Sequence, residues 1–179
     1  MALDFGRFSL AQLTVTQIPQ FKGLNTPDSV KQANLARLVK EVLEPLYERV
    51  GPFTIDSAFR NEAVNKAVGG SAYSFHVEGK AADLVPAMGA KAFAATIQKY
   101  PELRALVGEL IVNSDRIVHV SLPNPPKVYP ISRRIAGEGY VAFNTADLKK
   151  FISENAVEIK TGIAGFLLLG VGAYLALKK

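Results

Sequence analysis

A histidine and an aspartate stand seven positions apart in the segment SFHVEGKAAD, residues 74–83. Gly79 lies between His76 and Asp83, where a turn could fold the two side chains towards each other. Asp83 also leads into an apolar pair, Leu84-Val85, where a carboxylate is costly unless it has a strong partner such as a bound cation. A capping or turn aspartate is the alternative interpretation.

The second histidine of the chain, His119, lies in the β-rich run IVHVSL that starts at residue 117. Strand alternation places Val118 and Val120 on one face of this run and His119 on the other. Because the apolar face serves the core, we expect His119 to point away from it, towards a cleft. A boundary histidine without a ligand is the alternative.

Two imidazoles and one carboxylate match a catalytic zinc site, which has three protein ligands and an open position for water. The sequence contains no cysteine, so it excludes thiolate metal sites and disulfides. A single carboxylate leaves a zinc site with a net charge of about +1, which keeps the metal a good Lewis acid. The three residues therefore predict metal-assisted hydrolysis.

The spacing Ser74-x-His76-x-x-Gly79-x-Ala81-x-Asp83 resembles the signature of the D-alanyl-D-alanine carboxypeptidase-like zinc peptidases. This family includes many phage and bacterial peptidoglycan hydrolases. Five other segments resemble family motifs in the same order: NTP at 25–27, VLEPL at 42–46, SAFR at 57–60, NKAVGGS at 65–71 and VHVS at 118–121. The similarity spans about residues 8–122 and implies a D-Ala-D-Ala carboxypeptidase/Hedgehog-like fold.

By this resemblance, His76, Asp83 and His119 are the ligands of one Zn2+ ion. Arg60 is then expected to bind the substrate near the scissile bond, because a guanidinium pairs well with a carbonyl or carboxylate group. A surface ion pair with Glu62 is the alternative for this arginine. Ser74 is expected to hydrogen-bond the substrate or a metal ligand.

The general base is the point at which the chain departs from the family pattern. The family usually places an acidic residue three positions before the last histidine, and this sequence has Arg116 there. We predict Asp115, in the expected turn NSDR, as the base that the metal site needs. Glu109 on the neighbouring strand is the alternative base, and an ordinary turn role is the alternative for Asp115.

Helices and strands alternate irregularly along the sequence. A helix is expected after Thr26-Pro27-Asp28, with Pro45 bending or ending its last turn. Further helices are expected over 62–68, 91–100, 101–107 and from 145, and strands over 53–59, 81–85, 109–112 and 117–122, with an ordered loop over 123–140. We predict an α+β fold, with flanking helices on a small sheet that contains antiparallel strands.

The C-terminal stretch 162–177, GIAGFLLLGVGAYLAL, carries no charge and is followed by Lys178 and Lys179. As a helix it would be roughly 24 Å long, at about 1.5 Å per residue, which is shorter than a hydrocarbon core of about 30 Å. Because the run is uncharged and flanking lysines could reach the interfaces, we predict a transmembrane helix. A buried C-terminal helix is the alternative. The predicted domains are a zinc peptidase domain over 1–155 and a hydrophobic membrane anchor over 156–179.

The resemblance implies cleavage of amide bonds in the stem peptides or cross-bridges of peptidoglycan, in carboxypeptidase or endopeptidase mode. The N-terminus does not resemble a signal peptide, so we expect a phage lytic or virion-associated enzyme, membrane-associated in a virion or in the host envelope. The net charge of +5 suits anionic wall polymers or lipid headgroups, and no basic run suggests nucleic acid. The alternatives are a non-catalytic virion or wall-binding protein that keeps the fold, and a membrane-anchored structural protein without metal.

Overall fold

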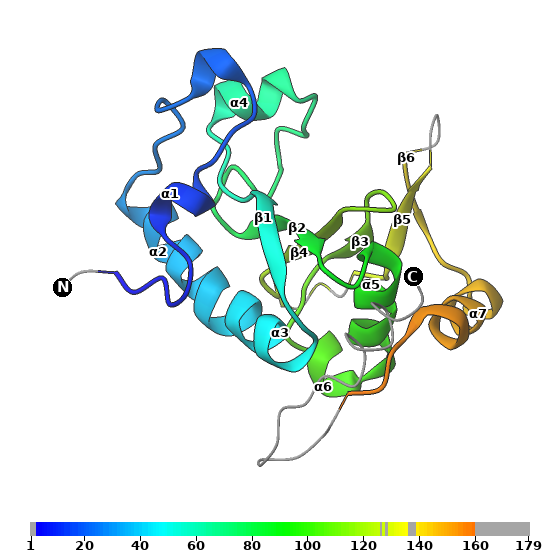
Figure 1. The fold of residues 1–179 in the computed structure, drawn as a ribbon. Helices are drawn as coiled ribbons and strands as arrows, with labels where there is room; N and C mark the ends of the chain where they lie inside the picture. Colours follow the sequence, from blue (N-terminus) through cyan, green and yellow to red (C-terminus); the bar gives the residue numbers. More distant parts are fainter. Residues whose placement is uncertain (1–2, 126, 128, 136–138, 160–179) are drawn as a thin grey trace, which may run out of the picture.

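A mixed β-sheet runs through the centre of the fold (Figure 1). The computed structural model describes residues 3–125, 127, 129–135 and 139–159. In this part of the chain the sheet has six strands, in the order β1-β2-β4-β3-β5-β6. They are β1 (Phe53–Ser57), β2 (Ala81–Pro86), β3 (Leu110–Val112), β4 (Val118–Ser121), β5 (Ser132–Ile135) and β6 (Gly139–Ala142). The β3–β5 pair is parallel and the other four pairs are antiparallel, which agrees with the predicted α+β class.

A long helical segment precedes the sheet. It consists of α2 (Ser29–Leu38), a π-helical turn (Val39–Leu43) and α3 (Glu44–Arg49). Asp28 caps α2, since its side chain accepts a hydrogen bond from the backbone N–H of Lys31. Pro45 lies in the first turn of α3, and the helix continues beyond it to Arg49, further than the sequence predicted. The π-helical turn directly before Pro45 marks the departure from α-helical geometry expected near a proline.

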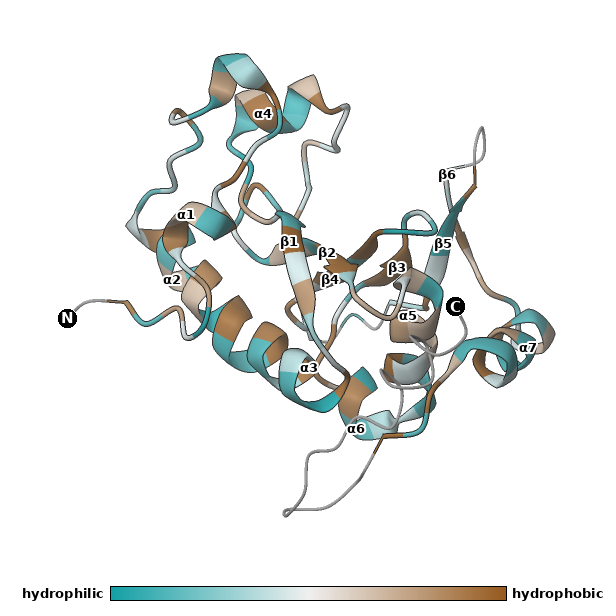
Figure 2. Cartoon of the chain, in the orientation of Figure 1, coloured by the Kyte–Doolittle hydropathy of each residue, from teal (hydrophilic) through white to brown (hydrophobic). Residues whose placement is uncertain are grey.

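Helices cover one face of the sheet and leave the other to the functional residues. The helix α5 (Ala90–Lys99) packs against β2, β3 and β4, while α6 (Pro101–Arg104) and α7 (Thr145–Asn155) pack against α5 or follow it. Leu84, Val118 and Val120 are fully buried under these helices, and Figure 2 shows β2 and β3 in the brown of apolar residues. Because successive side chains alternate across a strand, Asp83 and His119 point to the opposite face, which we call the site face.

Two short elements extend the N-terminal part of the chain. The helix α1 (Leu10–Leu13) has a capping box made by Ser9 and Gln12, and a 3₁₀ turn follows at Pro19–Phe21.

A further short helix, α4 (Glu62–Ala67), follows β1 and is capped by Asn61, as the sequence predicted. Gly79 has a φ of +69°, which suits the turn predicted between His76 and Asp83.

The segment 123–140 was expected to be a loop, and this prediction was wrong in its second half. Strands β5 and β6 form an antiparallel hairpin that extends the sheet beyond β3. Each strand has four residues, and the sequence SRRI of β5 has no apolar alternation strong enough to predict a strand. Figure 1 shows this hairpin projecting from the edge of the sheet that lies farthest from β1.

The prediction of a C-terminal transmembrane helix needs correction. No helix in the described part of the chain is long and apolar enough to cross a membrane. The apolar run 162–177, on which the prediction was based, lies outside the described residues. The predicted domain boundary after residue 155 stays a prediction, although residues 156–159 follow α7 and return to α5, where Ala156 and Ile159 pack against the core.

Candidate metal centre

The three predicted metal ligands meet on the site face. His76 comes from the loop before β2, Asp83 from β2 and His119 from β4, where the strand register places Asp83 directly opposite His119. His119 Nδ1 lies 3.0 Å from Asp83 Oδ1 and 3.2 Å from His76 Nε2, and His76 Nε2 lies 3.4 Å from the same Asp83 oxygen. The three atoms thus form a nearly equilateral triangle of possible metal donors.

The size of this triangle suits a zinc ion. Ligand atoms about 2.1 Å from a tetrahedral zinc ion lie roughly 3.4 Å from one another, close to the three separations observed here. Two imidazole nitrogens and one carboxylate oxygen are also ligand types that zinc prefers when cysteine is absent. The residues therefore fit a three-ligand zinc site with one coordination position left open.

The backbone around residue 58 holds the ring of His76. His76 Nδ1 lies 2.6 Å from the carbonyl oxygen of Ala58, so this nitrogen carries the hydrogen and donates it. The N–H of Arg60 in turn donates to the carbonyl of His76, at 3.1 Å. Because Nδ1 is protonated, Nε2 keeps its lone pair and points towards Asp83. Histidines that bind metals are commonly oriented by such a hydrogen bond from the other ring nitrogen.

Glu109 holds the second imidazole in the same way. Its Oε2 lies 3.1 Å from His119 Nε2, while His119 Nδ1 faces Asp83. A carboxylate can only accept at this distance, so Nε2 donates to Glu109 and Nδ1 is the atom available to a metal. Glu109 precedes β3, and its backbone is positioned by a hydrogen bond from its N–H to Ser121 Oγ.

A bulge in β1 brings Arg60 to Asp83. The pairing of β1 with β2 shifts between Ile55 and Ser57, so that Ser57 becomes the neighbour of Asp83. Ser57 Oγ accepts a hydrogen bond of 2.8 Å from Arg60 Nε, and an Nη of Arg60 pairs with Asp83 Oδ2. Arg60 thus occupies the carboxylate oxygen that does not belong to the donor triangle, which leaves Oδ1 for a metal.

The electrostatics of the site suit a bound cation. Burial would raise the pKa of Asp83, but the two imidazoles outweigh it and hold that pKa well below its usual value. Burial lowers the pKa of His76, so its ring is neutral. Burial would also lower the pKa of His119, but hydrogen bonds with Asp83 and Glu109 raise it to about 9. When no metal is bound, a proton on His119 Nδ1 therefore supplies the positive charge beside the Asp83 carboxylate.

The structure does not bring Asp115 to the metal cluster. Its side chain is 89% exposed and lies 2.8 Å from Lys91 Nζ, which lowers the pKa of the carboxyl group. The physical reason is the turn between β3 and β4, which directs Asp115 towards solvent rather than back over His119. Of the two carboxylates considered for the base, Glu109 is the one in contact with a predicted metal ligand.

Ser74 is half-buried, and its Oγ accepts a hydrogen bond of 3.3 Å from the backbone N–H of His76.

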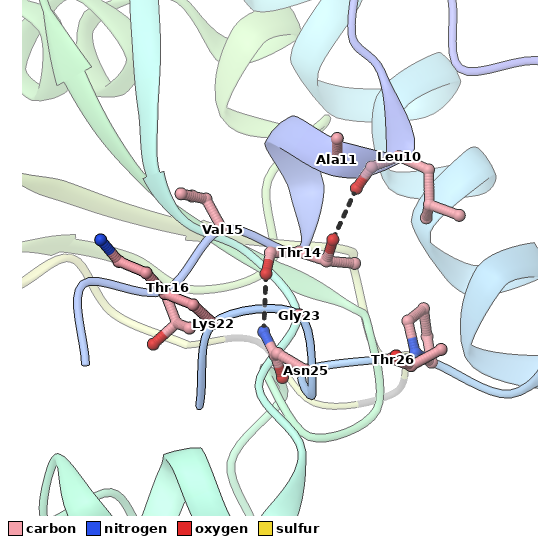
Figure 3. A pocket seen from close by; sticks show the side chains of 10 residues that line it. Leu10, Ala11, Thr14, Val15, Thr16, Lys22, Gly23, Asn25 and Thr26 are labelled. Atoms are coloured by element: carbon pink, nitrogen blue, oxygen red, sulfur yellow. Dashed lines mark hydrogen bonds between the residues drawn. The ribbon is translucent and has the colours of Figure 1, made fainter. Parts of the chain in front are cut away.

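Sequence reasoning missed the residue that anchors the loop around Arg60. Asn25 is 4% exposed, and its amide nitrogen donates to the carbonyls of Thr14 and Phe59 at 3.0 and 2.8 Å. Its side-chain oxygen accepts from the N–H of Asn61 at 2.8 Å. Figure 3 shows the hydrogen bond between the Asn25 side chain and the Thr14 carbonyl, at the edge of a pocket of about 530 Å³. Asn25 stood in the segment NTP that resembles the family, and this was the signal that could have identified it.

Comparison with known proteins identifies the family of the chain. The family model for Peptidase M15 matches residues 6–121, which contain all three possible metal ligands and Glu109. No curated protein matches the chain in a sequence comparison. Peptidases of this family depend on zinc, and the cluster of His76, Asp83 and His119 could hold the ion. The resemblance seen in the sequence is confirmed, and the chain belongs to the peptidase M15 family of zinc metallopeptidases.

Proposed function

We propose that the chain hydrolyses an amide bond in the peptide part of peptidoglycan, with zinc bound by His76, Asp83 and His119. The observation that carries this proposal is the donor triangle, in which each ligand side chain is oriented by a further hydrogen bond. Such preorganisation is typical of metal sites in enzymes, because it fixes the ligand geometry before the metal arrives. The family membership supplies the reaction class, hydrolysis of a peptide bond.

Zinc, when bound, supplies a Lewis acid for the scissile carbonyl and lowers the pKa of a water molecule. The chain's own residues orient the ligands and handle the proton. Arg60 and Ser57 hold Asp83 ionised with Oδ1 towards the site. His76 is held by the Ala58 carbonyl, so its lone pair remains directed at the same point.

We assign the proton transfer to Glu109. Its carboxylate is partly exposed on the site face and already contacts His119, whereas Asp115 is bonded to Lys91 in solvent. Glu109 Oε2 accepts a hydrogen bond from His119 Nε2, so the carboxylate must turn towards the substrate to take a proton from water. It then delivers this proton to the leaving amine, which balances the hydrolysis. The substrate-binding roles expected for Arg60 and Ser74 remain predictions.

The test compares the full chain with two matched amide variants, Glu109→Gln and Asp115→Asn. Zinc content and release of peptide fragments from purified peptidoglycan are measured for each. We expect one zinc per chain in all three proteins, a loss of at least about 100-fold in turnover for Glu109→Gln, and little change for Asp115→Asn. The reverse pattern would move the base to Asp115.

The products and the metal content decide the finer points. Release of single terminal residues would indicate a carboxypeptidase, and release of cross-linked fragments an endopeptidase. Zinc binding without hydrolysis would favour the alternative of a wall-binding protein that keeps the fold. A chain that binds no zinc would refute the proposal altogether. The location in a virion or host envelope stays a prediction.

A further inference from the structure

The site face extends beyond the metal cluster onto the hairpin β5–β6. His119 is paired with Ile111 in β3, and Ile111 is paired with Ser132 in β5. Paired residues in a sheet point to the same side, and so do residues two positions apart along a strand. Arg134, two residues after Ser132, is therefore on the site face, together with its β6 partner Tyr140.

The site face of this hairpin is open to solvent. Tyr140 is 61% exposed, and Arg134 and Ala142 are exposed as well. An exposed tyrosine beside an exposed arginine provides an apolar ring and a fork of N–H donors, a combination enriched in binding surfaces. No described residue forms an ion pair with Arg134. Figure 1 shows that no helix lies over the outer part of β5 and β6.

The neighbouring arginine provides a contrast. Arg133 alternates to the opposite face, and its guanidinium lies 5.1 Å from the centroid of the Phe143 ring. The side chain of Phe143 contacts Phe151 of α7, so Arg133 belongs to the packing between the hairpin and the helical layer. Both arginines are exposed, but Arg133 lies against an aromatic ring on the helix-covered side, whereas Arg134 lies on the site face.

The distance from the metal cluster suits a short peptide. From β4 to β6 there are three strand spacings, about 14 Å at roughly 4.8 Å each. An extended peptide covers that distance with about four residues, at roughly 3.4 Å per residue. The right-handed twist turns this surface gradually from strand to strand, so the path is curved but continuous.

We propose that Arg134 and Tyr140 form a binding surface for the acidic peptide stem of peptidoglycan, beyond the bond that is cut. Arg134 pairs with a free carboxylate of the stem, and the Tyr140 ring packs along the same extended peptide. This inference rests on the proposed function, because the cluster at His119 must receive the scissile bond. It adds a specificity site: the enzyme distinguishes a long anionic stem from a short fragment.

The experiment uses the full chain loaded with zinc and the variants Arg134→Gln, Tyr140→Ala and, as a matched control on the opposite face, Arg133→Gln. Values of kcat/KM are measured on a complete stem peptide, on the same stem with its free carboxylates amidated, and on the shortest fragment that the parent chain cuts. On the complete stem we expect losses of up to about fivefold for Arg134→Gln and roughly three- to tenfold for Tyr140→Ala. The shortest fragment should be cut at an unchanged rate by both.

The amidated stem measures the contribution of the Arg134–carboxylate pair separately from that of the Tyr140 ring contact. Arg134→Gln should make no difference on the amidated stem, whereas Tyr140→Ala should still lower kcat/KM. Equal losses on the long and short substrates would overturn the proposal, as would a loss of the same size for Arg133→Gln. No loss on the complete stem would overturn it as well.

A binding assay keeps this inference separate from the proposed function. Co-sedimentation of the zinc-loaded chain with purified peptidoglycan needs no turnover. If the parent chain binds the polymer but cuts nothing, the proposed hydrolysis fails, while weaker sedimentation of Arg134→Gln and Tyr140→Ala would still support the binding surface. If these variants sediment like the parent, or the parent does not sediment, the binding surface is refuted.

Discussion

Zinc binding to this chain should be coupled to the release of a proton from His119. Both ring nitrogens of His119 face carboxylates, and these hydrogen bonds outweigh burial and raise its pKa to about 9. A zinc ion needs the lone pair of Nδ1, so the proton must leave before the metal binds. The ring of His76 is already neutral and Asp83 already ionised near neutral pH, so they add little to this coupling.

The magnitude follows from the raised pKa. With a pKa of about 9, about 1% of the His119 rings are neutral at pH 7 and about half are neutral at pH 9. The apparent zinc affinity should therefore be about 50-fold higher at pH 9 than at pH 7. Above the pKa of His119 this contribution levels off.

Three measurements check this prediction. Competition with a chelating dye gives zinc affinity from pH 6.5 to 9, and calorimetry in two buffers with different ionisation enthalpies gives the number of protons released. An NMR titration of the metal-free chain reports the pKa of His119 directly. In Glu109→Gln one of the two carboxylates is lost, so the pKa of His119 should fall and the rise of zinc affinity with pH should level off at a lower pH. A neutral His119 ring in the metal-free chain at pH 7 would refute the reasoning.

Three further predictions concern stability. Because the folded pKa of His119 lies above the unfolded value of about 6.5, its contribution to metal-free stability is complete below pH 6.5 and is lost as pH rises through about 9, which thermal melts at pH 6 and pH 9 can compare. Asn25→Ala leaves the carbonyls of Thr14 and Phe59 and the N–H of Asn61 without their side-chain partner. It should lower the free energy of unfolding, measured by urea denaturation, by about 3 kcal/mol. A loss below about 1 kcal/mol would contradict a central role for Asn25. Gly79→Ala places a Cβ 2.7 Å from the Lys31 carbonyl at a positive φ and should cost roughly 2–4 kcal/mol in the same assay, with Gly69→Ala as a control that has a positive φ but open space.

The possible metal ligands could be predicted because simple rules determine their position. Alternation in a strand with an apolar face directs His119 to the other face, and a buried carboxylate such as Asp83 needs a cationic partner. The structure confirms that the three side chains come together on that face. The order of the helices and of strands β1 to β4 also followed the sequence pattern closely.

Other features depend on contacts that no local pattern contains. The choice between Asp115 and Glu109 depends on the conformation of a turn and on a diagonal contact between two strands. The β-bulge before Ser57 changes which side chain accompanies Asp83, and periodicity does not report a single inserted residue. The hairpin β5–β6 is short and polar, so its pairing with β3 is a tertiary effect that overrides weak local preference.

The last described residues lie on the helix-covered side of the domain. The N–H of Val157 donates to Thr96 Oγ1, and the N–H of Ile159 donates to the hydroxyl of Tyr100. Glu158 is bonded to the same tyrosine and to Lys99. These partners lie on α5 or directly after it, on the helix-covered side of the sheet. An attachment made at Ile159 would therefore hold the domain by its helix-covered side, and the site face that carries Asp83 and His119 would stay accessible on the opposite side.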